Sequence, residues 1–459
     1  MFTMRTRLPL VVLSAAALAA VGGSAVTASA AVRQAGQPRA VPASSSGRAA
    51  RGPAARTPAA ALAARLGLPA ARRVPTPGSS SVLNNIYCVA ASDCWAVGDY
   101  ATAHQGTRNQ ILHWTGKAWR TVAAPNPGGS AGSSVSELFG IRCTSSRNCW
   151  AVGYYTGRQG FRNEALRWNG SRWTVVSTPQ PGTATSGRVD ELFDVTCVSA
   201  SHCWAVGQDG VQGGTTVSRN EILRWNGRSW RLVRGVPNPA GTTSGDINGL
   251  SAIRCSTASH CLAVGEDGLG LPLLRNEAMR WNGRTWSVMK TPQPGGTSPG
   301  SVNALIGLTC ASPDDCWAAG TDGTFSAPIT LVNEVLHWNG SKWRLAAVPN
   351  PDGTGGGASN ELFGDFCSNS QNCWAVGDYG SISGGVGSIL TEALHWNGAT
   401  WTHVTTPSPG GTADKADSEL FAVRCSRPSA CWAVGSSQTP TGRTKNVLLE
   451  WNGTSWSVH

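Results

Sequence analysis

Fourteen cysteines occur in this chain as seven pairs, and five residues separate the two members of every pair. From one pair to the next, the first cysteines lie 54 to 58 residues apart. A nearly constant period of this length predicts a repeat architecture. Complete pairing also predicts a compartment in which disulfides persist. The pairs are Cys88/Cys94, Cys143/Cys149, Cys197/Cys203, Cys255/Cys261, Cys310/Cys316, Cys367/Cys373 and Cys425/Cys431.

Each repeat reads as four short β-strands, which the second copy illustrates. Its apolar runs, at 137–143, 149–153, 164–168 and 173–176, are separated by turn-forming residues. Asn169-Gly170, between the third and fourth runs, is a strong hairpin signal. Seven such antiparallel quartets predict an all-β, seven-bladed β-propeller with one disulfide per blade. A β-helix would need shorter rungs, and separate sandwiches would need about 100 residues each.

The tryptophans indicate how neighbouring repeats pack. Fourteen of the 20 Trp flank the predicted hairpin between the third and fourth strands, and the other six follow the second Cys of a pair. Only the fourth repeat departs from this rule, with Leu262 in place of Trp. Large side chains placed so regularly are expected to fill the spaces between blades. Each Cys pair should staple the hairpin between the first and second strands, and its spacing is not that of a redox or zinc site. Asn163-Glu164 and its equivalents in other repeats are expected to cap strands and tie loops to neighbours.

The chain divides into three parts. Residues 1–30 have the pattern of a secretory signal peptide, with Arg5 and Arg7, an apolar run from residue 8 to 21, and Ala28-Ser29-Ala30 as a cleavage site; an uncleaved anchor is the alternative. Residues 31–80 are rich in Ala, Arg and Pro and contain no acidic residue, Trp or Cys, which predicts a disordered basic linker. Residues 81–459 form the predicted propeller. We therefore expect an extracellular or cell-surface protein.

Most of the net charge of +11 belongs to the N-terminal part. The first 80 residues contain ten Arg and no acid, which leaves 27 basic and 26 acidic residues for 81–459. A nearly neutral folded part argues against nucleic acid as the main ligand. The basic linker can associate with cell-wall polyanions, or it can serve only as a solvated spacer.

The motif Trp168-Asn169-Gly170-Ser171-Arg172-Trp173 resembles the Asp-box turn of sialidase-type propellers, with Asn in place of Asp. The run from Leu138 to Gly153 is similar to repeats of exported actinobacterial β-propellers with Asp-box-like or kelch-like hairpins. This resemblance spans 81–459 and implies the fold. Sialidases use three Arg, a Tyr with its Glu, and a further acidic residue, and these do not match the chain residue by residue.

The predicted binding face is the one that carries the longer, Gly-rich loops. Four Glu stand at the head of innermost strands and are candidate ligand-binding residues: Glu137, Glu191, Glu361 and Glu419. Asp194 and Asp365 break the repeat on the same strands and are further candidates, each expected to have a polar partner because an unpaired buried carboxylate is costly; neutral drift is the alternative. Five other Asp are expected in loops, as turn formers: Asp99, Asp209, Asp267, Asp322 and Asp378.

The sequence contains no recognisable nucleophile–base arrangement, phosphate loop or metal motif, so we assign no catalytic residue, cofactor or metal ligand. We expect a secreted, monomeric binding or scaffold protein that presents its loop face to an extracellular glycan or protein. The alternative is a glycan hydrolase or lyase that uses carboxylates on the propeller rim. Paired carboxylates about 5–10 Å apart in a central pocket would favour the enzyme.

Overall fold

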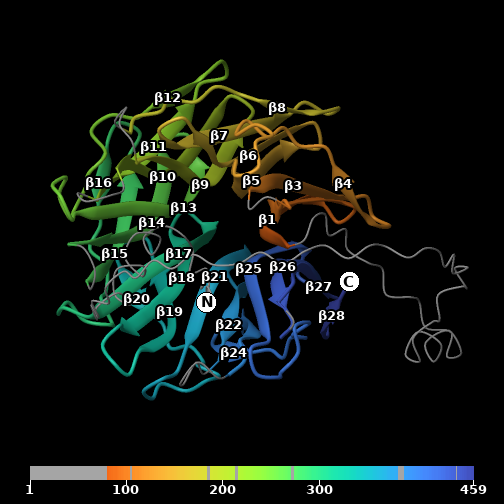
Figure 1. Cartoon of the computed structure of the whole chain (residues 1–459). Coiled ribbons are helices and arrows are strands. Elements are labelled where there is room, and N and C mark those ends of the chain that lie inside the picture. The colour runs from red at the N-terminus through yellow and green to blue at the C-terminus, as the bar shows by residue number, and fades with distance from the viewer. Residues whose placement is uncertain are drawn as a thin grey trace, which may run out of the picture.

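The computed structural model describes residues 80–103, 106–182, 187–211, 216–269, 273–380, 387–440 and 442–459. The predicted signal peptide and all but the last residue of the predicted linker lie outside this part of the chain. The described residues are all-β and contain no helix, and hence no helix able to cross a membrane. Their strands follow one another around a ring (Figure 1).

The strands come in consecutive groups of four. They are β1 (Ser81–Ala90), β2 (Asp93–Ala101), β3 (Thr107–Trp114) and β4 (Trp119–Val122); β5 (Ser136–Ser145), β6 (Asn148–Gly157), β7 (Gly160–Trp168) and β8 (Trp173–Val175); β9 (Arg188–Ser199), β10 (His202–Val211), β11 (Val217–Trp225) and β12 (Trp230–Leu232); β13 (Ile247–Thr257), β14 (His260–Gly268), β15 (Leu274–Trp281) and β16 (Trp286–Val288); β17 (Ser301–Ser312), β18 (Asp315–Thr324), β19 (Thr330–Trp338) and β20 (Trp343–Leu345); β21 (Asn360–Asn369), β22 (Asn372–Tyr379), β23 (Leu390–Trp396) and β24 (Trp401–His403); β25 (Asp417–Arg427), β26 (Ala430–Gln438), β27 (Thr444–Trp451) and β28 (Trp456–Val458).

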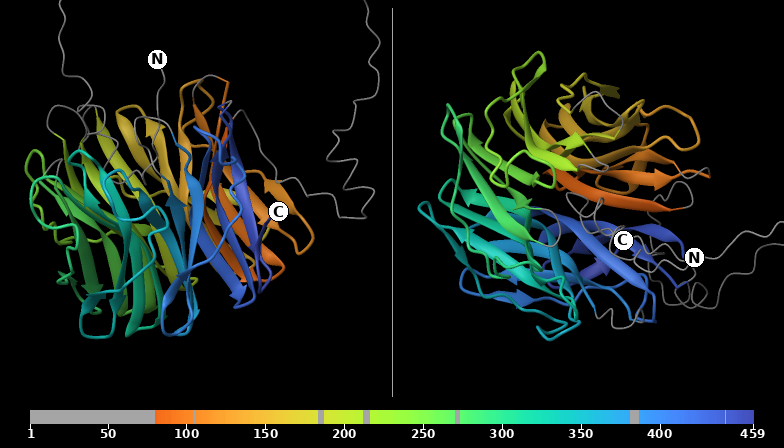
Figure 2. Two further views of the ribbon diagram at one scale, coloured as in Figure 1. Left: turned by 90° about the horizontal axis from the view of Figure 1, so that it is seen from below. Right: turned by 60° about the vertical axis from the view of Figure 1, so that its left-hand side comes forward.

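Within each group, consecutive strands pair antiparallel. Five groups form separate four-stranded sheets, whereas β5–β8 and β9–β12 join into one eight-stranded sheet through a parallel bridge between Gly160 and Arg188. The ring therefore has six or seven blades, depending on how that sheet is counted. The first strand of each group lies nearest the central axis (Figure 1), and the blades stand side by side when the ring is viewed from below (Figure 2).

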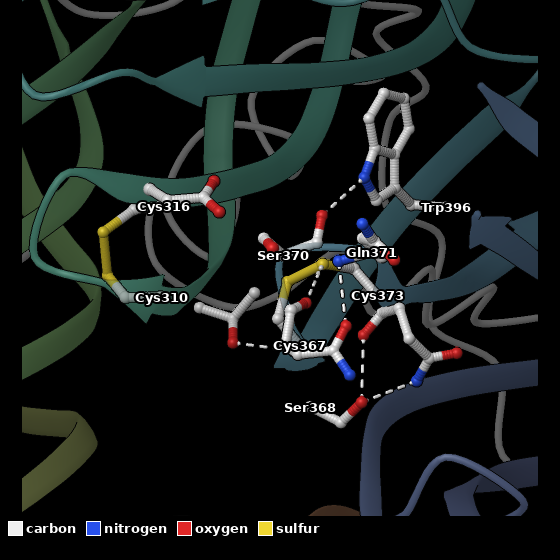
Figure 3. Close-up of a disulfide and its surroundings, with 12 residues drawn as sticks. Cys310, Cys316, Cys367, Ser368, Ser370, Gln371, Cys373 and Trp396 are labelled. Carbon is white, nitrogen blue, oxygen red and sulfur yellow. Dashed lines mark hydrogen bonds between the residues drawn. A yellow bond between two sulfur atoms is a disulfide. The ribbon is translucent and has the colours of Figure 1, made fainter. Parts of the chain in front are cut away.

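All seven Cys pairs are disulfides, and among the described residues no cysteine is free. Each links directly opposed residues of the first two strands of a group, with Cα atoms 3.8 to 4.0 Å apart. Figure 3 shows two of them, Cys310–Cys316 and Cys367–Cys373. Beside the second, Trp396 Nε1 donates a hydrogen bond to Ser370 O at 3.0 Å, which ties the outer hairpin to the disulfide turn.

The second cysteine of each disulfide is completely buried, a depth that the spacing alone did not predict. It packs between blades, in one buried cluster with the second-strand Trp or Leu of the preceding group, as Cys203 does with Trp150. These cysteines therefore belong to the core between blades, and they are not accessible to a ligand. The seven residues, each at most 1% exposed, are Cys94, Cys149, Cys203, Cys261, Cys316, Cys373 and Cys431.

The Trp residues pack between blades, as predicted. Trp204 of β10 lies against the Trp pair of the next group, with ring centroids 5.1 Å from Trp281 and 5.8 Å from Trp286. In the fourth group Leu262 takes this place and lies in one buried cluster with Trp338 and Trp343. Each inter-blade space thus contains a side chain from one second strand and two Trp from the following hairpin.

Truncating one of these Trp should destabilise the whole ring. We expect Trp204→Ala to cost about 3–5 kcal/mol, because it leaves a cavity between two blades. Trp204→Leu should cost less, because Leu262 occupies the same position in the fourth group. Chemical denaturation of the two variants measures the difference, and equal losses would contradict this packing role.

Side-chain packing closes the ring. Among the described residues, no strand of the last group pairs with the first group. Leu83 and Ile86 of β1 instead share a buried cluster with Ala422 and Val434 of the last group. Trp432 adds to it, with ring centroids 5.1 Å from Trp114 and 5.3 Å from Trp119.

Candidate functional site

The innermost strands surround a cavity of about 70 Å³ on the ring axis. Every one of them contributes to its lining, through residues one to four positions before the first Cys of its pair. The strands approach each other closely here. A Cβ atom on Gly140 would lie 2.8 Å from the Cα of Asp194, and one on Gly364 would lie 2.8 Å from the Cα of Ala422. The backbone spacing therefore requires glycine at these two positions.

Five of the seven residues that immediately precede a first Cys line this cavity at its disulfide end, and Thr196 and Thr309 do not. In chain order the seven positions hold Tyr87, Arg142, Thr196, Arg254, Thr309, Phe366 and Arg424. Three of the seven are thus arginines, contributed by β5, β13 and β25. All three are partly exposed, so solvent reaches them. The sequence analysis did not single out these arginines.

Arg142 and Arg424 stack on aromatic rings. Their guanidinium carbons lie 4.9 Å and 4.3 Å from the ring centroid of Tyr87. Arg424 also lies 4.2 Å from the ring centroid of Phe366. Such cation–π contacts hold a guanidinium by its faces. Among the described residues, neither guanidinium forms a hydrogen bond or an ion pair, and both Nε atoms are buried without a partner.

Arg254 is paired, and its partner is one of the two predicted Asp. Its Nη1 lies 2.5 Å from Oδ2 of Asp194, and that oxygen also accepts a hydrogen bond from the backbone N of Ile253 at 3.0 Å. Asp194 Oδ1 accepts from the backbone N of Val195 at 2.8 Å. Asp194 therefore has the expected partner and links the third and fourth groups of strands.

For Asp365 the expectation of a partner was wrong. It is buried, and neither carboxyl oxygen accepts a hydrogen bond from another described residue. It fits against a glycine: a Cβ atom on Gly307 would lie 3.0 Å from Asp365 Oδ1. Burial raises the pKa of Asp365 well above its ordinary value; the charge of Arg254 opposes this rise and that of Asp194 adds to it. Asp365 thus avoids the cost of an unpaired charge by retaining its proton.

The positive charges of the clustered arginines repel one another and lower the pKa of their neighbours. Burial, together with the positive charges of Arg142 and Arg254, lowers the pKa of Arg424 to about 9, while Tyr87 opposes the effect. Burial also lowers the pKa of Arg142, with a further contribution from Arg254. The cluster therefore holds excess positive charge that nearby carboxylates do not balance.

The four predicted Glu lie six positions before the first Cys, toward the opposite end of the same strands; Glu137, Glu191 and Glu361 are buried, and Glu419 is partly exposed. Glu137 accepts hydrogen bonds from Thr107 Oγ1 at 2.9 Å and from the Tyr154 hydroxyl at 2.8 Å. The others accept hydrogen bonds from the following partners: Glu191 from Gln208 at 2.7 Å, Glu361 from Ser359 at 3.2 Å, and Glu419 from Ser436 at 3.3 Å. The open carboxylate rim inferred from the sequence is therefore not the observed geometry, and a ligand contact at these Glu stays a prediction.

The placement of five Asp in loops was wrong. They lie inside the second strands of their groups and are buried: Asp99 in β2, Asp209 in β10, Asp267 in β14, Asp322 in β18 and Asp378 in β22. The strands extend further than the turn-forming residues suggested. Among the described residues, no group of three or more His, Cys, Asp or Glu is placed to hold a metal ion.

A series of side-chain hydrogen bonds joins successive blades. In five successive interfaces, Asn Nδ2 on one third strand donates to Glu Oε1 on the next: Asn109 to Glu164 at 2.5 Å, Asn163 to Glu221 at 2.6 Å, Asn220 to Glu277 at 2.7 Å, Asn276 to Glu334 at 2.5 Å and Asn333 to Glu392 at 2.7 Å. We call these pairs the Asn–Glu ladder. At the next interface Thr391 and Val447 replace Asn and Glu. The ladder has the predicted role of tying each blade to its neighbour.

All five Glu of the ladder are buried, and the second carboxyl oxygen of each has no hydrogen-bond partner among the described residues. Burial raises the pKa of each well above its ordinary value, and the hydrogen bond from Asn only partly opposes this. The ladder therefore retains protons that the same residues release in water.

No protein-family model and no curated protein matches the sequence. Among solved structures, U3-55K matches with 12% identity and a TM-score of 0.46, covering 79% of this chain and 91% of that one. An ulvan lyase of a polysaccharide lyase family, bound to -[GlcA(1-4)Rha3S]-, matches with 10% identity and a TM-score of 0.51, covering 84% and 98%. The β-propeller domain of the Trilobed protease from Pyrococcus furiosus matches with 8% identity and a TM-score of 0.43, covering 83% and 97%. Consecutive antiparallel sheets arranged around a ring make this chain a repeat β-propeller, and its seven disulfides indicate an oxidising, extracellular environment.

Proposed function

We propose that this protein is an exported, seven-bladed β-propeller that binds an extracellular glycan or protein. Seven strand groups with one disulfide each support the blade count. Residues 1–30 would direct export, residues 31–80 would form a basic linker, and residues 81–459 would form the ring. An affinity of the linker for cell-wall polyanions would retain the protein near the cell surface.

The outer hairpins support the proposed kinship with Asp-box-like and kelch-like exported propellers. In the second blade, Asn169 Oδ1 accepts hydrogen bonds from the backbone N of Ser171 at 2.9 Å and of Arg172 at 3.0 Å. Asn226, Asn282 and Asn452 form the same turn in other blades. A side-chain oxygen thus closes the turn, which is the task that an Asp would perform in an Asp box.

One observation carries the proposed binding function: Arg142 and Arg424 are partly exposed at the axis but lack acidic partners. Arginines that only support a fold are normally satisfied by carboxylates or carbonyl groups. The outer Nη groups of Arg142 and Arg424 are available to a ligand that reaches the disulfide end of the axial cavity. We therefore place the binding site at that end, whereas the loop rim predicted from the sequence lies at the other.

The enzyme alternative has one specific observation in its favour. Asp194 is hydrogen-bonded to Arg254, whereas burial raises the pKa of Asp365 well above its ordinary value. Two carboxyl groups in different environments, one ion-paired and one unpaired, are a starting point for general acid–base chemistry on a glycan. Incubation with acidic polysaccharides, followed by detection of new reducing ends or unsaturated uronates, tests this alternative, with Asp365→Asn as the control.

Glycan and peptide arrays probed with the full mature chain test the binding function. We expect binding to a defined class of ligands, because the site is preformed. A variant with Gln at positions 137, 191, 361 and 419 should bind equally well, since these Glu are hydrogen-bonded to neighbours and lie away from the arginines. Loss of binding in this variant would move the site to the loop rim. Absence of any ligand on both arrays would contradict the proposed function.

A further inference from the structure

We propose that the arginine cluster at the disulfide end of the axial cavity binds one oxyanion. This oxyanion is a carboxylate or a sulfate group that projects from an acidic polysaccharide. This inference rests on the proposed binding function and names its ligand class. The cluster comprises Arg142, Arg254 and Arg424, with Tyr87 and Phe366 as the rings on which two of them stack.

The positive charges around the axial cavity are only partly balanced, which favours the binding of an anion. Three guanidinium groups meet there, and only Arg254 has a carboxylate partner, Asp194. Asp365 lies in the same lining but has no ion pair. Crowded cations in a partly desolvated site repel one another more strongly than in water. A bound oxyanion would compensate this repulsion without any change in the fold.

The geometry suits an oxyanion. Because aromatic rings cover the faces of Arg142 and Arg424, their N–H groups remain free at the edges of the guanidinium planes. The planar fork of Arg matches the two oxygens of a carboxylate or of a sulfate. The buried Nε atoms of both residues have no other partner among the described residues. The Nη groups of both arginines are not among the buried atoms, and they are the donors that a ligand would satisfy while the Nε atoms stay covered.

The cavity is large enough for an anionic group. Its volume of about 70 Å³ is well above the roughly 10–15 Å³ that one water molecule needs by the same measure. A carboxylate or a sulfate group therefore fits this space. In our proposal the ligand inserts such a group while the rest of the molecule stays on the disulfide face.

That face carries cations at the spacing of the blades. Each of the first five outer hairpins presents one exposed basic residue, and two disulfide turns add one each: Lys117, Arg172, Arg228, Arg284, Lys342, Arg147 and Arg427. Of its acids, Asp93 and Asp315 pair with His113 and His337, and Asp314 is exposed. Cations on five successive hairpins around the central cluster suit a ligand that carries several anionic groups, for which we propose an acidic polysaccharide.

Calorimetric titration of the full mature chain with sulfate and with glucuronate tests the site. Chloride at matched ionic strength serves as the reference. We expect one sulfate or glucuronate per chain and no comparable binding of chloride. Arg142→Met and Arg424→Met should each weaken the affinity about tenfold or more, the usual loss for a charge-assisted hydrogen bond. Arg158→Met, at an exposed arginine in the turn between β6 and β7 at the opposite end of the blades, should leave the affinity unchanged. Chloride binding as tight as sulfate, or equal effects of all three variants, would overturn the proposal.

Chemical modification of the wild-type protein gives a test that does not depend on the folding of variants. Phenylglyoxal should modify Arg142 and Arg424 more slowly when sulfate is present, and the exposed Arg158 at the same rate, as mapped by mass spectrometry. Equal modification with and without sulfate would contradict an anion site at these residues.

Polymers of equal charge density separate the ligand classes. We expect polyglucuronate to bind more tightly than polyglutamate, and the reverse order would exclude the polysaccharide. If neither the glycan array nor the peptide array shows a ligand but sulfate still binds, the anion site is supported and the proposed function is rejected. Array binding that survives Arg142→Met and Arg424→Met would support the function and reject this site.

Discussion

Reduction of all seven disulfides is expected to unfold the ring completely. Each disulfide closes a loop of six or seven residues, and the chain-entropy model assigns about 2.3 kcal/mol to a loop of that size. Together the seven contribute roughly 16 kcal/mol, which exceeds the 5–15 kcal/mol by which folded domains are usually stable. Protein that has been denatured, reduced and alkylated should therefore regain no cooperative melting transition, whereas the oxidised protein should refold.

A single-blade variant provides the matched control. Removing one disulfide with Cys255→Ala and Cys261→Ala should cost only about 2 kcal/mol in chemical denaturation and leave the ring folded. Mass spectrometry of a non-reduced digest should find seven local links and no free thiol. Links between blades, or a fully reduced protein that melts like the oxidised one, would contradict this account.

The features that the sequence predicted well are local or strictly repeated. The Cys pairs, the Asn-Gly hairpins and the Trp positions each involve residues within a few positions of one another, and each recurs in nearly every blade. Antiparallel pairing of consecutive strands then leaves few arrangements for the chain. The Asn–Glu ladder could be predicted for the same reason, because both partners recur once per blade.

The arginine cluster could not be predicted in the same way, although a signal exists. Arg142, Arg254 and Arg424 share one position, immediately before the first Cys. Each innermost strand, however, has a register shift between Leu and the residue two places on, as between Leu138 and Gly140. Such a β-bulge changes which side chains face the axis, and simple alternation does not reveal it. Asp365 illustrates a second limit, because a missing partner depends on neighbours far away in the chain.

Raising the pH from 5 to 9 is expected to destabilise the propeller strongly. A carboxyl group whose pKa is higher in the folded protein than in the unfolded chain stabilises the fold fully at pH values below its unfolded pKa, near 4.5. That contribution is lost as the pH rises through the folded pKa. Burial raises the pKa of Asp190 to about 6, that of Glu191 and Asp322 to about 7, and that of Glu266 to about 8. The loss of stability should therefore be steepest between about pH 5 and pH 8.

The Asn–Glu ladder should extend this loss to higher pH, because burial raises the pKa of its five Glu well above the ordinary value. Each tenfold difference in proton affinity between the folded and unfolded states is worth about 1.4 kcal/mol per group, and five groups act together. Differential scanning calorimetry should give a melting temperature at pH 5 that exceeds the value at pH 9 by more than about 5 °C.

Replacing the ladder glutamates by glutamine isolates their contribution. Gln has the shape of the neutral acid and cannot ionise, so a variant with Gln at 164, 221, 277, 334 and 392 should melt higher than the wild type at pH 9. At pH 5, where the wild-type acids are protonated in the fold, the two proteins should melt alike. Glu450→Gln is the matched control, because Glu450 also lies on a third strand but its side chain is 44% exposed. Stability changes with pH only where the folded and unfolded states bind different numbers of protons. Equal slopes of melting temperature against pH for the wild type and the five-Gln variant would therefore show that the ladder glutamates do not cause the pH dependence.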